Sequence, residues 1–136
     1  MAEVAKAGTP SLCTMGADAG ERIAGDIFAG EPLAAGDACY IKPADGAVYR
    51  SLGSAAAGSD SAQVHGFTPR SAKAGDAVSL YANVNFRYGA SLTPGKRLYL
   101  SDQTPGALAD VPTVGGTAPV GFTIDASRIR VRQSSY

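Results

Sequence analysis

Only one histidine, His65, occurs in this chain of 136 residues, so a Ser-His-Asp mechanism would have to depend on it. His65 precedes the sequence Gly-Phe-Thr, and a second Gly-Phe-Thr follows Val120. A histidine at a position where the other copy has valine is more consistent with a structural or surface role than with a general base. The sequence therefore predicts no catalytic residue.

Metal and phosphate sites are also poorly represented. The two cysteines, Cys13 and Cys39, are too few for a zinc site or a disulfide framework, and Cys39 is expected to be a small buried apolar residue. The Ala-Gly-Asp sequences at 35–37 and 74–76 are typical of turns and supply one carboxylate each. No Gly-rich phosphate-binding motif is present. We therefore expect no metal, no cofactor and no enzymatic activity, although the paired carboxylates of a small polysaccharide hydrolase stay open.

Arginines alternate with aliphatic residues near the end of the chain. A period of two is typical of a β-strand, so Ile129 and Val131 should face inward. The guanidinium groups of Arg128, Arg130 and Arg132 should then face outward. Such a row could protect an edge strand from aggregation, or it could bind carboxylates across a subunit or host interface.

A polar and aromatic segment is the second candidate contact region. It runs from Asn83 to Tyr88 at the end of an expected strand, and its candidate contact residues are Asn85, Phe86, Arg87 and Tyr88. Two interpretations stay open, packing with turn capping on one side and a subunit contact on the other.

The charge of the chain is balanced but unevenly distributed. Residues 1–60 carry a net charge of −4 and residues 61–136 a net charge of +4. This asymmetry could orient protomers or partners, or it could be neutralised within one compact domain. No basic cluster is dense enough for nucleic-acid binding, and no apolar run is long enough for a membrane span or a secretory signal. We expect a protein made and kept reduced in a cytoplasm, without nucleic-acid, membrane or small-molecule partners.

Three sequence elements occur twice in the same order. Residues 33–41 resemble 92–100, residues 46–48 resemble 106–108, and residues 66–68 resemble 121–123, at offsets of 59, 60 and 55. Two copies of this length do not fit a solenoid, which needs three or more short units. They favour a duplicated β unit that closes on itself.

Short apolar segments separated by Gly, Pro and Asp turns predict about eight to ten β-strands and no long helix. The clearest is 77–86, in which alternate apolar residues should share one face. Other expected strands are 21–28, 38–42, 63–68, 97–101, 120–124 and 128–132, with a hairpin turn at 45–46. We therefore expect an all-β domain over residues 21–136, a small barrel or sandwich built from two related units.

Residues 1–20 contain scattered apolar residues without a sustained period. This pattern predicts either an extended N-terminal arm or plain disorder. In an ordered arm, Val4, Pro10 and Leu12 are the residues expected to lie on a neighbouring surface.

Seven motifs between residues 21 and 132 form a recognisable set. They are Gly36-Asp-Ala-Cys-Tyr-Ile, Asp45-Gly-Ala-Val-Tyr-Arg, His65-Gly-Phe, Leu92-Thr-Pro-Gly-Lys-Arg-Leu-Tyr-Leu-Ser, Thr104-Pro-Gly-Ala-Leu, Pro119-Val-Gly-Phe and Ser127-Arg-Ile-Arg-Val. Together they resemble the small capsid decoration, or cement, proteins of tailed bacteriophages. The most specific part is the Leu-Thr-Pro-Gly stretch with the Thr-Pro-Gly and Pro-Val-Gly that follow it.

The resemblance implies a β-tulip-like domain that forms a homotrimer on the outer surface of the virion. It would bind the mature head at three-fold and quasi-three-fold positions and stabilise the shell of the major capsid protein, with help from the N-terminal arm. The interface residues expected on this interpretation are Val4, Pro10, Leu12, Asn85, Phe86, Arg87, Tyr88, Arg128, Arg130 and Arg132. The alternative is a β-rich head-fibre or tail adaptor, or another protein-binding module of the virion.

Overall fold

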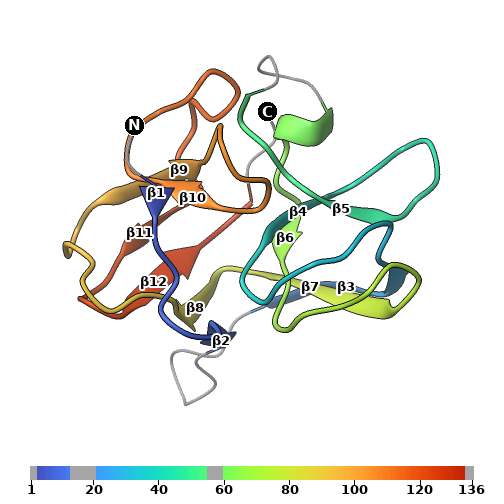
Figure 1. The fold of residues 1–136 in the computed structure, drawn as a ribbon, viewed down its shortest axis with the longest axis horizontal. Helices are drawn as coiled ribbons and strands as arrows, with labels where there is room; N and C mark the ends of the chain where they lie inside the picture. The colour runs from blue at the N-terminus through green and yellow to red at the C-terminus, as the bar shows by residue number, and fades with distance from the viewer. Residues whose placement is uncertain (1–2, 13–20, 55–59, 134–136) are drawn as a thin grey trace.

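The computed structural model describes residues 3–12, 21–54 and 60–133, and this part of the chain is built almost wholly from β-strands (Figure 1). The strands form one sheet of seven and one sheet of five, which lie side by side. The all-β class predicted from the sequence is confirmed.

The five-stranded sheet has the order β3-β7-β6-β4-β5, and every pairing in it is antiparallel. Its strands are β3 (Glu21–Phe28), β4 (Ala38–Ile41), β5 (Val48–Arg50), β6 (Gly66–Phe67) and β7 (Ala77–Ala82). A short 3-10 helix, η2 (Asp60–Ala62), precedes β6. The strand predicted over 21–28 is confirmed by β3, and the predicted hairpin joins β4 to β5.

The seven-stranded sheet has the order β1-β10-β9-β11-β12-β8-β2, again with antiparallel pairings. Its strands are β1 (Glu3–Val4), β2 (Ser11–Leu12), β8 (Val84–Arg87), β9 (Arg97–Leu100), β10 (Leu108–Ala109), β11 (Gly121–Thr123) and β12 (Arg128–Val131). The N-terminal segment supplies both outermost strands, because β1 pairs with β10 and β2 pairs with β8. Residues 3–12 therefore run from one edge of this sheet to the other.

Apart from β1 and β2, the two sheets have the same strand order relative to the chain. The order β3-β7-β6-β4-β5 corresponds strand by strand to β8-β12-β11-β9-β10. The register also matches, because Cys39 pairs with Gly66 in one sheet and Leu98 pairs with Gly121 in the other. These four residues occupy equivalent positions in the repeated sequence elements.

A threonine fixes the same turn in each sheet. Thr68 Oγ1 accepts a hydrogen bond from the Asp37 amide (3.3 Å) and donates one to the Ala34 carbonyl (2.8 Å). Thr123 Oγ1 likewise accepts a hydrogen bond from the Lys96 amide (2.9 Å) and donates one to the Thr93 carbonyl. In each sheet, the threonine of the Gly-Phe-Thr motif therefore holds the turn before the next strand, residues 34–37 in one sheet and 93–96 in the other, through the same two hydrogen bonds.

The alternating segment 77–86 is not one strand, so that prediction is wrong. The segment is interrupted at Asn83, whose φ of 52° lies in the left-handed region that asparagine tolerates better than most residues. Before the interruption β7 belongs to the five-stranded sheet, and after it β8 belongs to the seven-stranded sheet. Leu80 and Phe86, which were expected on one face, consequently pack in two different apolar clusters.

The larger apolar cluster draws residues from both sheets. Phe67 of the five-stranded sheet packs against Phe86 of the seven-stranded sheet, with 6.3 Å between the ring centroids. The smaller cluster, which includes Cys39, Val48 and Leu80, lies on the opposite face of the five-stranded sheet. One face of that sheet is therefore committed to the junction with the other sheet.

Candidate interaction surface

The side chains considered above for chemistry have structural roles. His65 Nδ1 accepts a hydrogen bond from the Ile41 amide (2.8 Å), and burial lowers the pKa of this imidazole. Cys39 is fully buried, as predicted, and burial raises the pKa of its thiol. Cys13 lies outside the described residues.

Metal-binding groups of three or more His, Cys, Asp or Glu side chains do not occur among residues 3–12, 21–54 and 60–133. In the same ranges, no helix is long and apolar enough to cross a membrane.

An exposed aromatic side chain lies on the outer face of the seven-stranded sheet. Leu98 and Ile129 point into the core, so their neighbours in β9 and β12 point outward. Phe122 of β11 lies between these strands, paired with Arg97 on one side and Arg130 on the other. Its side chain is 48% exposed, which is unusual for a phenylalanine in the middle of a sheet.

The predicted arginine row is present around this phenylalanine. The side chain of Arg130 donates to the Asn85 side-chain oxygen (3.2 Å), and Arg132 donates to a backbone carbonyl (3.4 Å). Arg128 forms an ion pair with Asp125 (2.8 Å). Backbone amides of Ser127 and Arg128, together with the Arg128 side chain, donate to Asp125 and lower its pKa to about 2.

The arginine row does not protect a sheet edge, so that interpretation is wrong. β12 has a neighbour on each side, β11 and β8, and its backbone groups are paired on both. Protection of an exposed strand edge therefore does not explain why these arginines point outward.

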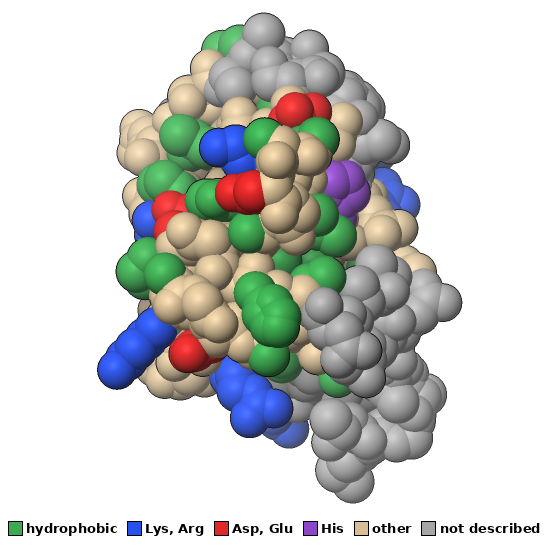
Figure 2. Space-filling view, turned by 90° about the vertical axis from the view of Figure 1, so that its right-hand side faces the viewer, with side chains coloured by type: hydrophobic (Ala, Val, Ile, Leu, Met, Phe, Trp, Pro, Cys, Tyr) green, Lys and Arg blue, Asp and Glu red, His purple; other side chains and the backbone are tan. Residues whose placement is uncertain are grey.

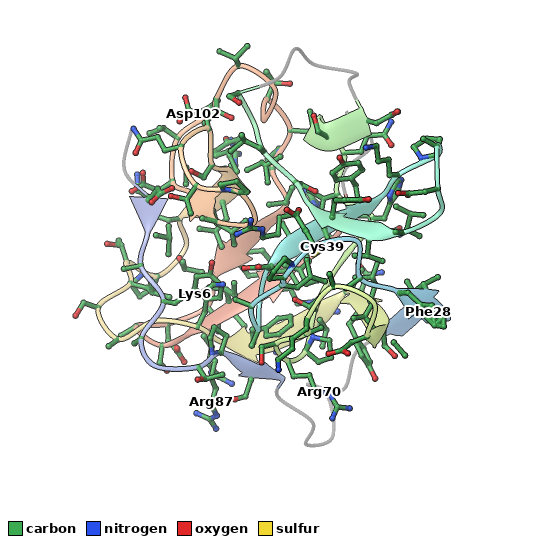
Figure 3. All side chains as sticks on the ribbon, turned by 45° about the vertical axis from the view of Figure 1, so that its right-hand side comes forward. Lys6, Phe28, Cys39, Arg70, Arg87 and Asp102 are labelled. Carbon is green, nitrogen blue, oxygen red and sulfur yellow. The ribbon has the colours of Figure 1, made fainter. Side chains whose placement is uncertain are left out.

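The segment Asn85–Tyr88 divides between the core and the surface. Phe86 and Tyr88 are fully buried, which favours the packing interpretation for both. Asn85 is 6% exposed and accepts the bond from Arg130. Arg87 alone is exposed and extends from the lower edge of the molecule in Figure 3.

The same positions in the five-stranded sheet have the opposite environment. Ala38 pairs with Phe67 where Arg97 pairs with Phe122 in the other sheet. Ala38 and Phe67 are both fully buried and belong to the apolar cluster that contains Phe86. This face is therefore buried against the other sheet in the five-stranded sheet, whereas it is exposed in the seven-stranded sheet.

Figure 2 shows the side of the molecule formed by the five-stranded sheet, where acidic and basic side chains are intermixed. Three ion pairs join described residues, namely Lys6–Asp37, Glu31–Arg50 and Asp125–Arg128. Each joins residues of the same half of the sequence, so none of the three neutralises one half with the other.

The N-terminal segment is docked on its own chain. The Lys6 ammonium group forms an ion pair with the buried Asp37 carboxylate (2.6 Å) and points into the molecule in Figure 3. Glu3 accepts hydrogen bonds from the Ser101 hydroxyl (2.5 Å) and the Thr104 amide (3.2 Å), and the Ser101 bond is the main cause of its lowered pKa.

Two predicted contact residues of this segment, Val4 and Pro10, also lie against their own chain. Val4 packs against the larger apolar cluster and Pro10 is buried. The backbone of Leu12, in β2, pairs with that of Phe86 in β8. The surface that Val4 and Pro10 meet is therefore part of the same molecule.

A cavity of about 290 Å³ separates the N-terminal segment from the turn at 90–96, and Glu3 and Asp110 both line it. A hydrolase that uses two carboxylates needs one with a raised pKa to act as the acid. The pKa of Glu3 is lowered, because its carboxylate is committed to Ser101 and Thr104. Glu3 is therefore an anchor of the segment and not a suitable general acid.

No protein-family model matches this chain, and none of the curated proteins matches it significantly.

Two residues of the exposed face, Arg97 and Phe122, are not among the contact residues predicted from the sequence. The alternation Arg-Leu-Tyr-Leu in β9 could have placed Arg97 outward. No comparable signal exists for Phe122, because the equivalent Phe67 is buried.

Proposed function

We propose that this protein decorates the head of a tailed bacteriophage. It binds the outer surface of the mature head at three-fold and quasi-three-fold positions and stabilises the shell of the major capsid protein. The observation that carries the proposal is the exposed face with Phe122 among arginines, on a chain whose motifs resemble capsid decoration proteins. The protein acts by binding, without a cofactor and without catalysis.

The same proposal accounts for the repeated architecture. We take the two sheets to be related units in tandem, because strand order, register and the threonine bonds occur twice. One unit is anchored to the other through Phe67, which leaves the second unit free to present its outer face. Such a rigid body suits a protein that must hold neighbouring shell subunits at a fixed distance.

A homotrimer would strengthen the effect. Each protomer adds a modest contact, but three linked protomers bind several shell subunits at a high effective concentration. Because the protein would bind only the expanded shell, its binding energy stabilises that state against dissociation.

The proposal is tested by sedimentation of the purified protein alone, with mature heads and with procapsids. We expect a trimer that co-sediments with mature heads and stays in solution with procapsids. Equal binding to both particles, or binding to neither, would contradict the proposed function.

The docked N-terminal segment favours a second candidate, a head-fibre or tail adaptor. Residues 3–12 are held by Asp37 and by both edges of their own sheet, so they are not free to reach a shell in this arrangement. An adaptor would bind isolated tails or fibres in the same sedimentation assay and would leave heads unbound.

A further inference from the structure

We infer that the outer face around Phe122 binds an acidic protein segment, one that carries carboxylates on both sides of an apolar side chain. This inference rests on the proposed decoration function and specifies the chemistry of the partner surface. The Phe122 face consists of Phe122, the flanking Arg97 and Arg130, and the more distant Arg87 and Arg132.

The first argument is the charge of the face. Among the described residues, Arg97 and Arg87 have no ion-pair partner, and Arg130 and Arg132 donate only to uncharged oxygens. Among the described residues, the one carboxylate that forms an ion pair with the row is that of Asp125, and Arg128 already holds it. Guanidinium groups in this state favour carboxylates, which they bind through two parallel hydrogen bonds.

The second argument is the apolar centre of the face. Cross-strand neighbours on one face of a sheet lie within contact distance, so Arg97 and Arg130 border the Phe122 ring directly. An exposed aromatic with arginines around it is the arrangement enriched in the energetic centres of protein interfaces. A ligand that satisfies the whole face must therefore supply an apolar group between its charges.

The third argument is the use that the chain already makes of this face. In the five-stranded sheet the equivalent residue Phe67 is fully buried against Phe86 of the other sheet. In the five-stranded sheet this position therefore packs against another sheet of the same chain. In the other unit Arg97 stands where Ala38 stands in the first, which changes the preferred partner from an apolar core to an acidic surface.

Nucleic acid is the less suitable ligand for the face. Proteins that bind single strands stack successive bases on several aromatic rings, and Phe122 is the only exposed aromatic among the outward residues of β9, β11 and β12.

The binding experiment uses the full chain, isotope-labelled for amide NMR, and two short peptides. One peptide alternates Glu with Leu, and the other alternates Glu with Ser. We expect shifts centred on Arg97, Phe122 and Arg130, with the Leu peptide bound at least about threefold more tightly because it covers Phe122. Shifts centred on another surface, or tighter binding of a thymidine oligonucleotide to these residues, would overturn the inference.

Variants separate the contributions of charge and apolar contact. The double variant Arg97→Glu/Arg130→Glu should weaken binding of the Leu peptide at least about tenfold. Phe122→Ala should remove the preference for the Leu peptide and leave binding of the Ser peptide unchanged. Arg70→Glu is the matched control, because Arg70 is exposed on the loop between β6 and β7 of the five-stranded sheet (Figure 3), and it should have no effect. Equal losses in the control and the double variant would contradict the inference.

Sedimentation with mature heads distinguishes failure of this inference from failure of the proposed function. If the wild-type protein and the double variant bind heads equally, decoration stands and the Phe122 face is not the contact. If neither binds heads while the peptide results hold, decoration fails and the acidic partner lies elsewhere. If Phe122→Asp converts an oligomer into monomers, the face joins copies of this chain and the inference is overturned.

Discussion

The two sheets present the same face to different surroundings. In the five-stranded sheet, Ala38 and Phe67 are fully buried against the neighbouring sheet, whereas their equivalents Arg97 and Phe122 are exposed. The scaffold around both pairs is alike in strand order, register and turn bonds. The comparison teaches that the same strand arrangement can bury a face in one sheet and expose it in the other, where we propose that it binds a partner.

The largest expected difference is between the two phenylalanines. Phe67→Ala should lower the free energy of unfolding by about 3–5 kcal/mol, because it opens a cavity in the shared core. Phe122→Ala should change it by no more than about 0.5 kcal/mol, because the side chain is half exposed. Urea unfolding of both variants measures the contrast. Equal losses of unfolding free energy would contradict the difference in burial between the two faces.

The next contrast concerns the turn residues Asp37 and Lys96, which are equivalent positions of opposite charge. Lys6→Ala leaves the Asp37 carboxylate buried without its ion pair, and we expect a loss of about 2 kcal/mol in unfolding free energy. Lys96→Ala, at an exposed position, should cost less than about 0.5 kcal/mol. Thermal and urea unfolding provide the test, and an unaffected Lys6 variant would mean that this ion pair does not hold the N-terminal segment.

The threonine bonds should be equally important in the two sheets. Thr68→Val and Thr123→Val preserve shape and remove a hydroxyl that both donates and accepts, so each should cost about 1–2 kcal/mol. Thr117→Val is the control, because Thr117 is exposed. A large loss in only one of the two buried variants, by urea unfolding, would break the equivalence of the units.

The smallest effect distinguishes His65 from its equivalent Val120. Burial lowers the folded-state pKa of His65 below the ordinary value of 6.5, so its contribution to stability is present above that pH and is lost as the pH falls through the folded pKa. Between pH 8 and pH 5, wild-type protein should lose stability relative to His65→Val, measured by urea unfolding at each pH. Parallel stability curves for the two proteins would contradict this role.

Local patterns were sufficient to predict much of the fold. Alternation located β3 and β12, and turn residues located the hairpin between β4 and β5. The buried state of Cys39 followed from its equivalence to Leu98. These features depend on neighbouring residues and on burial of one face, which a sequence records directly.

Features that depend on distant contacts could not be predicted. The interruption at Asn83 leaves the alternation of side chains intact, so the sequence gives no sign that β7 and β8 belong to different sheets. The two-residue strands β1 and β2 are too short for a periodic signal. The N-terminal segment that contains them is held by residues distant in the sequence, such as Asp37. The exposure of Phe122 depends on which sheet has a neighbour, and the identical Gly-Phe-Thr motifs do not record that.

Two phenylalanines with nearly equal exposure allow the most direct test of the central claim. Phe122 is 48% exposed and Phe28, at the end of β3 (Figure 3), is 49% exposed. Hydroxyl-radical labelling should modify both in the free protein, and in protein bound to mature heads it should spare Phe122 while still modifying Phe28. Equal labelling of Phe122 in the free and head-bound protein, or protection of Phe28 alone, would contradict the claim that the outward face of the seven-stranded sheet is the binding surface.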